Sequence, residues 1–327
     1  MTSGPRAHVR NLSIVCALAF VPFVPLPGQT APLADHHQHL FSPAAAVLVT
    51  GDTSATGISA RDLIGLLDSA GIRRALVLSV AYTWGSANRT VDNEYEKVKA
   101  ENDWTSRQVA QYPDRLRAFC SFNPLKPYAM DELARCAQDK QLRRGLKLHF
   151  GNSDVDLDNP QNVQQVRKIF RAANARRMPI VIHMHTSISK HRNYGRDEAL
   201  VFLNELLPAA PDVPVQIAHL AGAGDYDTTT DAALNVFEEA ISKHDPRVKN
   251  LWFDVTSVVL PGIAPDKATL VAARIRQIGL RRVLYGSDAH GGGNLAPREG
   301  WAAFRQLPLT EKEFRTIAQN LAPYMRW

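Results

Sequence analysis

The chain has 327 residues, of which 45% are hydrophobic and 21% charged, and its formal net charge is +6. This length and composition allow a large buried core and exclude an intrinsically disordered chain. Its three cysteines (Cys16, Cys120 and Cys136) form no Cys-x-x-Cys pair, and we expect no disulfide framework. If Cys120 and Cys136 stay free, we expect them to be buried packing residues.

The first thirty residues differ from all that follow. Arg6 and Arg10 precede an apolar run over residues 12–27, and no acidic residue lies among the thirty. A basic start, an apolar stretch and small residues near its end are typical of a secretory signal peptide. The run is short for a membrane span, and its prolines would break a helix. We therefore predict a signal peptide over residues 1–30 and export to the periplasm or the medium.

Beyond this segment, short apolar runs alternate with amphipathic stretches. The apolar runs predict eight strands, at residues 33–39, 75–81, 116–122, 145–150, 180–185, 215–220, 251–255 and 283–287. The amphipathic stretches predict helices between them, at residues 60–69, 93–111, 130–140, 162–175, 197–207, 231–244 and 265–278. Two further helices are expected near residues 297–306 and 310–319.

Strands that read as continuous Val, Ile and Leu runs between helices indicate a parallel sheet covered on its faces. About eight such units over roughly 250 residues favour an α/β fold of the (β/α)8 TIM-barrel type over an open doubly wound sheet. The Gly-x-Gly-x-x-Gly turn that a Rossmann sheet carries after an early strand does not occur. We therefore predict that residues 31–327 form one TIM-barrel domain.

Basic residues recur just before several predicted strands. The pairs are Arg73-Arg74, Arg143-Arg144, Arg176-Arg177 and Arg281-Arg282. These positions follow predicted helix C-termini, where cations meet the negative end of the helix dipole. In a barrel they would all lie on the face opposite the catalytic end. The positive charge is therefore expected to be structural, and a nucleic-acid partner is not expected.

Histidine and aspartate residues fall at the C-terminal ends of four predicted strands. They are His37 and His39 in the first strand, His183 in the fifth, His219 in the sixth and Asp288 in the eighth. Alternate residues of a strand share a face, and the strand ends of a barrel converge on one mouth, so these side chains would meet there. Imidazoles so placed bind a divalent ion, with Zn²⁺ the default for nitrogen ligands. The pattern predicts a metal site.

With these residues the chain resembles the amidohydrolase superfamily, and within it the amidohydrolase-related group that includes aminocarboxymuconate-semialdehyde decarboxylase. The resemblance covers nearly everything after residue 33. Its motifs are Asp35-x-His37-x-His39, Arg115-Leu-Arg-Ala-Phe-Cys-Ser-Phe-Asn-Pro124, Gly145-Leu-Lys-Leu-His149, Pro179-x-x-x-His183, His219-Leu-Ala-Gly and Gly286-Ser-Asp288. The resemblance implies that His37, His39 and His183 are metal ligands, that Asp288 is a ligand and proton acceptor, and that His219 is a polarising or proton-transferring base.

These implied roles are chemically consistent. Three imidazoles and a carboxylate leave a position open for water, whose pKa the ion lowers to about 7. Asp288 would take the proton of that water, and His219 would polarise the substrate oxygen or protonate the leaving group. Asp35, one step deeper on the same face, is expected to orient a ligand rather than to bind the ion. We expect one Zn²⁺-like ion, with His219 beside it but not required for binding.

The roles of the other inward-facing residues remain open. In relatives with two metals, a carboxylated lysine at the position of Lys147 bridges the ions, and such a binuclear site is the alternative to an ordinary lysine paired with an acid or with the substrate. His149, on the same strand, is expected either near the metals or in contact with the substrate. We expect His185 to contact the substrate rather than a metal. Tyr82 and Trp84, after the second strand, either line the pocket or only pack.

The site supports more than one reaction. The leading interpretation is an exported metal-dependent hydrolase that uses metal-activated water to cleave a C–O or C–N bond of a lactone, ester or amide. The alternative is a metal-dependent decarboxylase acting on an aromatic or enol carboxylic acid. A catalytically inactive metal-binding module comes third, because every motif position needed for catalysis is filled. We expect a small-molecule substrate and no membrane contact after signal removal, and the oligomeric state stays open, a homodimer included.

Overall fold

Eight parallel strands form one sheet, in which each strand pairs with the next along the chain. The strands are β1 (Ala34–Gln38), β2 (Arg74–Leu78), β3 (Leu116–Ser121), β4 (Leu146–His149), β5 (Ile180–His183), β6 (Val215–Ile217), β7 (Leu251–Asp254) and β8 (Val283–Leu284). The computed structural model describes residues 30–185, 191–289 and 294–326. The predicted signal peptide, apart from Thr30, lies outside the described residues.

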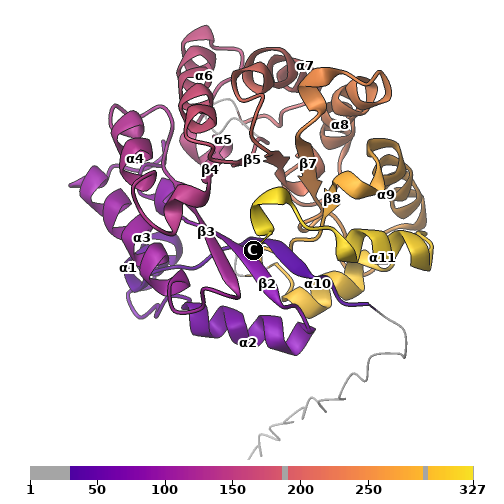
Figure 1. The fold of residues 1–327 in the computed structure, drawn as a ribbon, viewed down its shortest axis with the longest axis horizontal. Coiled ribbons are helices and arrows are strands. Elements are labelled where there is room, and N and C mark those ends of the chain that lie inside the picture. Colours follow the sequence, from indigo (N-terminus) through magenta and orange to yellow (C-terminus); the bar gives the residue numbers. More distant parts are fainter. Residues whose placement is uncertain (1–29, 186–190, 290–293, 327) are drawn as a thin grey trace, which may run out of the picture.

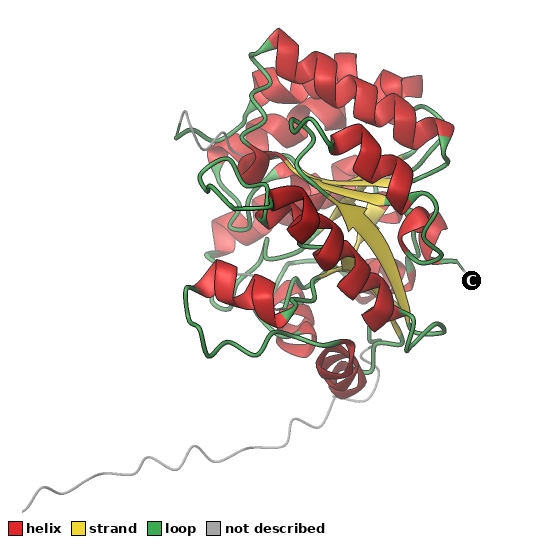
Figure 2. Cartoon of the chain, turned by 90° about the vertical axis from the view of Figure 1, so that its left-hand side faces the viewer, coloured by secondary structure: helices red, strands yellow, loops and turns green. Residues whose placement is uncertain are grey.

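The sheet closes on itself between its first and last strands. The backbone N–H of His36 donates to the carbonyl of Tyr285 at 2.8 Å, and the N–H of Asp288 donates to the carbonyl of His37 at 2.8 Å. Helices surround the strands in the view along the barrel (Figure 1) and cover them from the side (Figure 2). The fold is a (β/α)8 TIM barrel, as the sequence predicted.

Helices alternate with the strands along the whole barrel. They are α1 (Pro43–Thr50), α2 (Ala60–Ala70), α3 (Glu94–Val109), α4 (Ala129–Cys136), α5 (Phe150–Ser153), α6 (Pro160–Ala175), α7 (Arg196–Val201), α8 (Thr228–Ser242), α9 (Pro265–Ile278), α10 (Pro297–Phe304) and α11 (Glu311–Gln319). The short helices α1 and α5 were not predicted, because neither carries a clear amphipathic pattern. Over the described ranges, no helix combines the length and the apolar character that a membrane span requires.

The C-terminal residues cover the end of the barrel at which the strands begin. Met325 is fully buried in a cluster with Leu76, Phe119 and Val181, which lie inside the barrel. The Tyr324 hydroxyl donates to the side-chain oxygen of Gln216 on β6. In Figure 1 the C-terminus accordingly lies near the centre of the ring of helices. This end of the barrel is therefore closed, and the opposite end is the one that can hold a site.

The basic pairs lie at the closed end. Arg74 begins β2, and 3₁₀ turns that contain Arg144 and Arg282 lead directly into β4 and β8. Burial lowers the pKa of Arg117 on β3 to about 10, and the nearby Arg144 and Arg74 lower it further. The arginines thus cluster where the strands begin, which confirms the predicted placement of the basic pairs.

Cys120 and Cys136 form a disulfide, contrary to the expectation of no disulfide framework. Their Cα atoms are 6.1 Å apart, and both residues are fully buried. Cys120 lies on β3 and Cys136 ends α4, so the two sulfurs meet only because α4 packs back against the strand that precedes it. A separation of 16 residues carries no recognisable cysteine motif, which is why the sequence did not reveal the pair.

Reduction of this disulfide should destabilise the protein by about 3 kcal/mol, the value expected for opening a loop of this length. We expect the urea midpoint of the native protein to fall on treatment with a reductant. The double variant Cys120→Ala with Cys136→Ala serves as the control, because its midpoint should not respond to the reductant. A native protein whose midpoint is the same before and after complete reduction would contradict the prediction.

Candidate metal centre

A cavity of about 350 Å³ lies at the C-terminal ends of the strands. Seven residues singled out from the sequence line it: His37, His39, Lys147, His149, His183, His219 and Asp288. They come from β1, β4, β5 and the segments that follow β6 and β8, so the barrel brings together positions up to 251 residues apart. The open mouth of the barrel is therefore the candidate site.

Three of the histidines form a hydrogen bond through Nδ1, which places the proton of each neutral ring on that atom. Nδ1 of His37 donates to Oδ2 of Asp254 at 3.1 Å, and Nδ1 of His39 donates to a carbonyl at the end of β2 at 2.6 Å. Nδ1 of His219 donates to the carbonyl of Thr256 at 2.8 Å. With the proton on Nδ1, each ring turns the lone pair of Nε2 toward the cavity, which is the arrangement of metal-binding histidines.

The possible donor atoms lie close together. One ligand atom each from His37, His219 and Asp288 fall within 4.8 Å of one another. Nε2 of His39 lies 3.6 Å from Oδ1 of Asp288, and the ring of His183 is centred 4.7 Å from that of His219. All five predicted metal and catalytic residues therefore converge, and His219 lies within the tightest group.

The protonation states of these groups fit a divalent cation. Burial, together with the charge of Lys147, lowers the pKa of His37 to about 3, so the ring is neutral near pH 7. Oδ1 of Asp288 is buried and accepts no hydrogen bond from any residue that the structure describes. A buried carboxylate oxygen without a donor is costly, and a metal ion among nitrogen donors would satisfy it. The residues present therefore fit a divalent metal ion.

Lys147 lies beside this group, fully buried on β4. Its Nζ is 3.4 Å from Nε2 of His37. Burial lowers the pKa of Lys147 to about 8, while the nearby carboxylates of Asp288 and Asp254 raise it. The lysine therefore lies within the charge field of two carboxylates. The same position would also place a carboxylated lysine among the histidines.

His149 differs from the other histidines in its tautomer. Its Nδ1 accepts a hydrogen bond from the backbone N–H of Asn152 at 3.1 Å, so the proton of the neutral ring lies on Nε2. The ring stacks on that of His183, its partner in the β4–β5 register, with centroids 4.0 Å apart. His149 therefore offers the cavity a hydrogen-bond donor. His185 is buried outside the cavity lining.

Asp35 and Gly286 tie β1 to the segment after β8. The Asp35 carboxylate accepts from the backbone N–H of His37 at 3.0 Å and from the Ser287 hydroxyl at 2.7 Å. A methyl group at Gly286 would lie 2.8 Å from Cβ of His37 and 2.4 Å from the Thr256 hydroxyl, so only glycine allows this close approach. The segment Gly286-Ser287-Asp288 after β8 therefore packs directly against His37 on β1.

Several residues around the site have strained backbone dihedral angles. His219, Leu220 and Ala221 have φ values of 55°, 50° and 72°, and Asp288 and Ser257 have φ values of 51° and 55°. Non-glycine residues in this left-handed region cost about 1–3 kcal/mol each, and such residues concentrate at functional sites. The left-handed turn ends β6 at Ile217, earlier than predicted, and it aims His219 into the cavity.

The sequence analysis missed Asp254, the last residue of β7. Its carboxylate accepts from Nδ1 of His37, from the amide of Gln216 at 2.6 Å and from the backbone N–H of His219 at 3.0 Å. Burial alone would raise its pKa, but His37 and His219 hold the pKa of Asp254 well below the usual range. An aspartate at a strand end, like Asp288, was the signal that could have revealed it.

The cavity also has lining residues that the motifs did not reveal. They include Arg89 in the loop after β2, Asn152 after β4 and Asn294 after β8. Tyr82 lines the cavity and its ring is centred 5.0 Å from that of His149, whereas Trp84 is buried outside the lining. These residues surround the metal-binding group with polar and aromatic contacts for a small molecule.

Comparison with known proteins gives a family match. A family model described as amidohydrolase matches residues 34–320. No curated protein sequence matches.

Solved structures share the fold at low identity. A probable 2-pyrone-4,6-dicarboxylic acid hydrolase from Acinetobacter baumannii is 17% identical with a TM-score of 0.59, and the match covers 88% of this chain and 96% of that one. The 5-carboxyvanillate decarboxylase of Sphingomonas paucimobilis is 15% identical with a TM-score of 0.58, over 88% and 97% of the two chains. A dihydroxybenzoic acid decarboxylase from Polaromonas sp. JS666, with bound manganese, is 15% identical with a TM-score of 0.58, over 89% and 95%.

Proposed function

The chain belongs to the amidohydrolase family, and from this premise we propose that it is a metal-dependent decarboxylase that removes a carboxylate from an aromatic or enol acid. This reverses the order expected from the sequence, where hydrolysis came first. Decarboxylases are prominent among the similar structures, although a hydrolase occurs there too. The family acts on small molecules, and the proposal concerns which reaction this member catalyses.

The charge of the cavity carries the proposal. Its lining holds two basic side chains, Lys147 and Arg89, against one carboxylate, Asp288, while its five imidazoles are kept neutral by burial. Arg89 has no acidic partner among the residues that the structure describes. Placing a substrate carboxylate in a largely buried cavity requires such cationic partners, whereas a neutral lactone, ester or amide does not. The cavity is therefore better suited to an acid than to a neutral substrate.

We assign the metal to His37, His39, His183 and Asp288, with His219 beside it. When bound, a divalent ion would supply positive charge that orients an acidic substrate and neutralises charge developing on its oxygens. Zn²⁺ remains our proposal for its identity, and Mn²⁺ is the alternative, since one similar structure holds manganese. A single ion also remains a proposal.

Decarboxylation breaks a C–C bond, releases CO₂ and leaves the electron pair on a carbon that then takes a proton. Burial lowers the pKa of His219, so its ring is neutral near pH 7 and the lone pair of Nε2 is free to accept a proton from an enol or phenol hydroxyl. We therefore propose His219 as the base and Asp288, which lines the same cavity, as the group that relays the proton to carbon.

Product analysis tests the proposal. A panel of hydroxybenzoic acids, enol acids and lactone acids, incubated with the metal-loaded protein in ²H₂O, should yield CO₂ and a product that carries deuterium on the carbon that bore the carboxyl group. Hydrolysis is the second candidate, favoured by the similar pyrone-dicarboxylic acid hydrolase, and it would show as ¹⁸O uptake from labelled water without CO₂. Metal binding without turnover on any member of the panel would support the inactive module.

Replacing Arg89 with methionine should raise KM by about 10- to 100-fold, because a hydrogen bond to a charged group contributes about 1.5–3 kcal/mol. We expect kcat to change less, since the guanidinium lies at the cavity and not within the metal-binding group. Steady-state kinetics on an acid that is turned over checks this. Arg61→Met, on the exposed surface of α2, is the control and should leave KM unchanged. An unchanged KM in Arg89→Met would exclude Arg89 from substrate binding.

We also propose that the protein is exported. The composition of residues 1–30 supports this, and so does the Cys120–Cys136 disulfide, because disulfides persist mainly in oxidising compartments. Mass spectrometry of the protein purified from its native source should find a chain that starts near residue 31. An intact terminus at Met1 or Thr2 would contradict export by signal cleavage.

A further inference from the structure

Asn294, which lies outside the family motifs, holds the carboxylate of Asp288, and Ser257 in turn contacts Asn294. Asn294 lies ahead of α10 and Ser257 lies in the segment after β7, so the two residues come from different barrel loops. Nδ2 of Asn294 donates to Oδ2 of Asp288 at 2.9 Å and to the backbone carbonyl of the same residue at 3.1 Å. One amide group therefore restrains both the side chain and the main chain of Asp288.

Ser257 determines which way the Asn294 amide faces. Its hydroxyl donates to Oδ1 of Asn294 at 2.6 Å. Because the amide oxygen is engaged by that donor, the NH₂ group must turn toward Asp288, where both of its protons find acceptors. The three residues thus form a directed chain of hydrogen bonds from Ser257 through Asn294 to Asp288.

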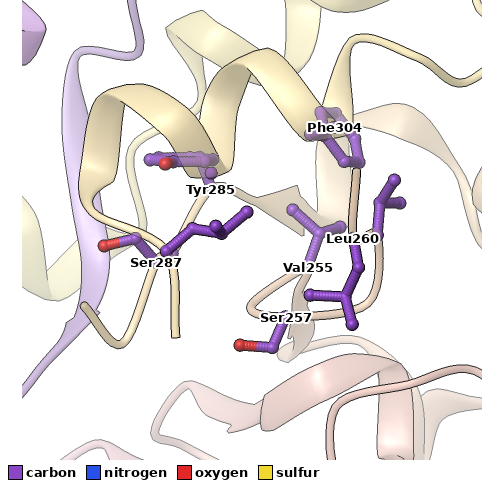
Figure 3. Close-up of a pocket in the computed structure, with 10 residues that line it drawn as sticks. Val255, Ser257, Leu260, Tyr285, Ser287 and Phe304 are labelled. Carbon is purple, nitrogen blue, oxygen red and sulfur yellow. The ribbon is translucent and has the colours of Figure 1, made fainter. Parts of the chain in front are cut away.

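The position of Ser257 is itself constrained. Its φ of 55° lies in the left-handed region, which few non-glycine residues adopt. In Figure 3 the hydroxyl of Ser257 points away from Leu260 and Phe304, which line a small cavity together with Ser257. The hydroxyl is directed toward Asn294, to which it donates.

The consequence for Asp288 is an asymmetric carboxylate. Oδ2 is held by Asn294, whereas Oδ1 is buried, accepts no hydrogen bond within the described part of the chain, and lies 3.6 Å from Nε2 of His39. Rotation about the Cβ–Cγ bond would exchange the two oxygens. The bond from Asn294 opposes that rotation, so Oδ1 stays on the side of the histidines.

We propose that Asn294 and Ser257 are positioning residues that select Oδ1 of Asp288 as the oxygen presented to the metal ion. The inference rests on the metal centre of the proposed function, and it holds whether the reaction is decarboxylation or hydrolysis. Groups that orient a metal ligand through a hydrogen bond typically change metal affinity by 10- to 100-fold when removed. Asn294 should act directly on Asp288, and Ser257 should act through Asn294.

Metal affinity of the purified full-length protein tests this, measured with Zn²⁺ and Mn²⁺ in competition with a chelator. Asn294→Leu keeps the branched shape and the number of side-chain heavy atoms but has no donor, and it should weaken binding by about 10- to 100-fold. Ser257→Gly, which removes the hydroxyl at a position whose φ of 55° glycine tolerates, should weaken binding by a smaller factor. Asn162→Ala is the control, because Asn162 also holds a loop, through the backbone N–H of Asp156 at 3.0 Å, but does not line the cavity.

The outcomes separate the inference from the function on which it rests. Thermal unfolding of the metal-free proteins shows whether each variant is folded. The unfolding midpoint of Asn294→Leu should lie within a few degrees of that of the native chain. If Asn294 only fills space in its loop, Asn294→Leu will bind metal as tightly as the native chain, and the inference is overturned. If the native chain itself binds neither ion, the metal centre fails and the inference fails with it.

Discussion

Replacing His37 with alanine should remove both the metal ion and the activity. His37 contributes to the tightest donor group, and its ring is fixed by Asp254 at 3.1 Å and approached by Lys147 at 3.4 Å. Without the ring, the ion loses a nitrogen ligand whose orientation the fold has already set. The metal content measured by elemental analysis should fall from about one ion per chain to near zero, and turnover should fall to the uncatalysed rate. His183→Ala should behave in the same way.

The control for this experiment is His244→Asn on the exposed surface. His244 has a φ of 55°, a conformation that asparagine tolerates, so the variant should keep its metal and its rate. Circular dichroism of metal-free His37→Ala must show a folded chain, because the change also leaves Asp254 without one donor. Full metal content in His37→Ala would contradict the ligand assignment. Two ions per chain with a carboxylated Lys147 would replace the single-ion proposal and recast His219 as a ligand of the second ion.

Removing the His219 side chain should preserve the metal but reduce kcat by about 10²- to 10⁴-fold, the usual contribution of a general acid or base. Asparagine is the suitable replacement, because the φ of 55° at this position would strain alanine. The reason for the loss is that Nε2 of His219 faces the cavity while Nδ1 is bound to the carbonyl of Thr256 at 2.8 Å. Steady-state kinetics and elemental analysis of His219→Asn, run together, separate the two effects.

The two possible results assign His219 to one of two roles. A folded variant that keeps one ion and loses turnover is expected for a base. A variant that loses the ion would make His219 a ligand, as its place within 4.8 Å of His37 and Asp288 allows. A variant with both metal and normal kcat would exclude His219 from the chemistry. Lys243→Ala, on the exposed end of α8, is a second control that should change neither quantity.

The fold could be predicted from the sequence because its signals are local. Each strand of the barrel is buried on both faces and therefore reads as a continuous apolar run, and each long helix carries an amphipathic face. The predicted strand at 180–185 and the observed β5 (Ile180–His183) differ by only two residues. The predicted strand boundaries were wrong where tertiary contacts overrode the apolar pattern of the sequence. β8 ends at Leu284, before the predicted end at residue 287, although Tyr285 and Asp288 still form backbone hydrogen bonds to β1.

The residues of the candidate site could be named from the sequence because side chains at the C-terminal ends of parallel strands must converge. The sequence could not reveal which other residues hold these side chains in place through hydrogen bonds. The carboxylate of Asp254 reaches His37 across 217 positions, and Asn294 reaches back to Asp288 from an irregular loop. Such contacts follow no period and no spacing, so only the folded chain reveals them.

The sequence by itself determined the barrel, the end at which the site lies, and the histidines and aspartate that converge there, because apolar periodicity and strand ends are local properties. Only the tertiary structure decided the tautomers of the histidines, the left-handed turn at His219, the free oxygen of Asp288 and the Cys120–Cys136 disulfide. The physical reason is that hydrogen bonds between distant residues, and the packing of α4 on β3, depend on where whole elements lie and not on their own sequences.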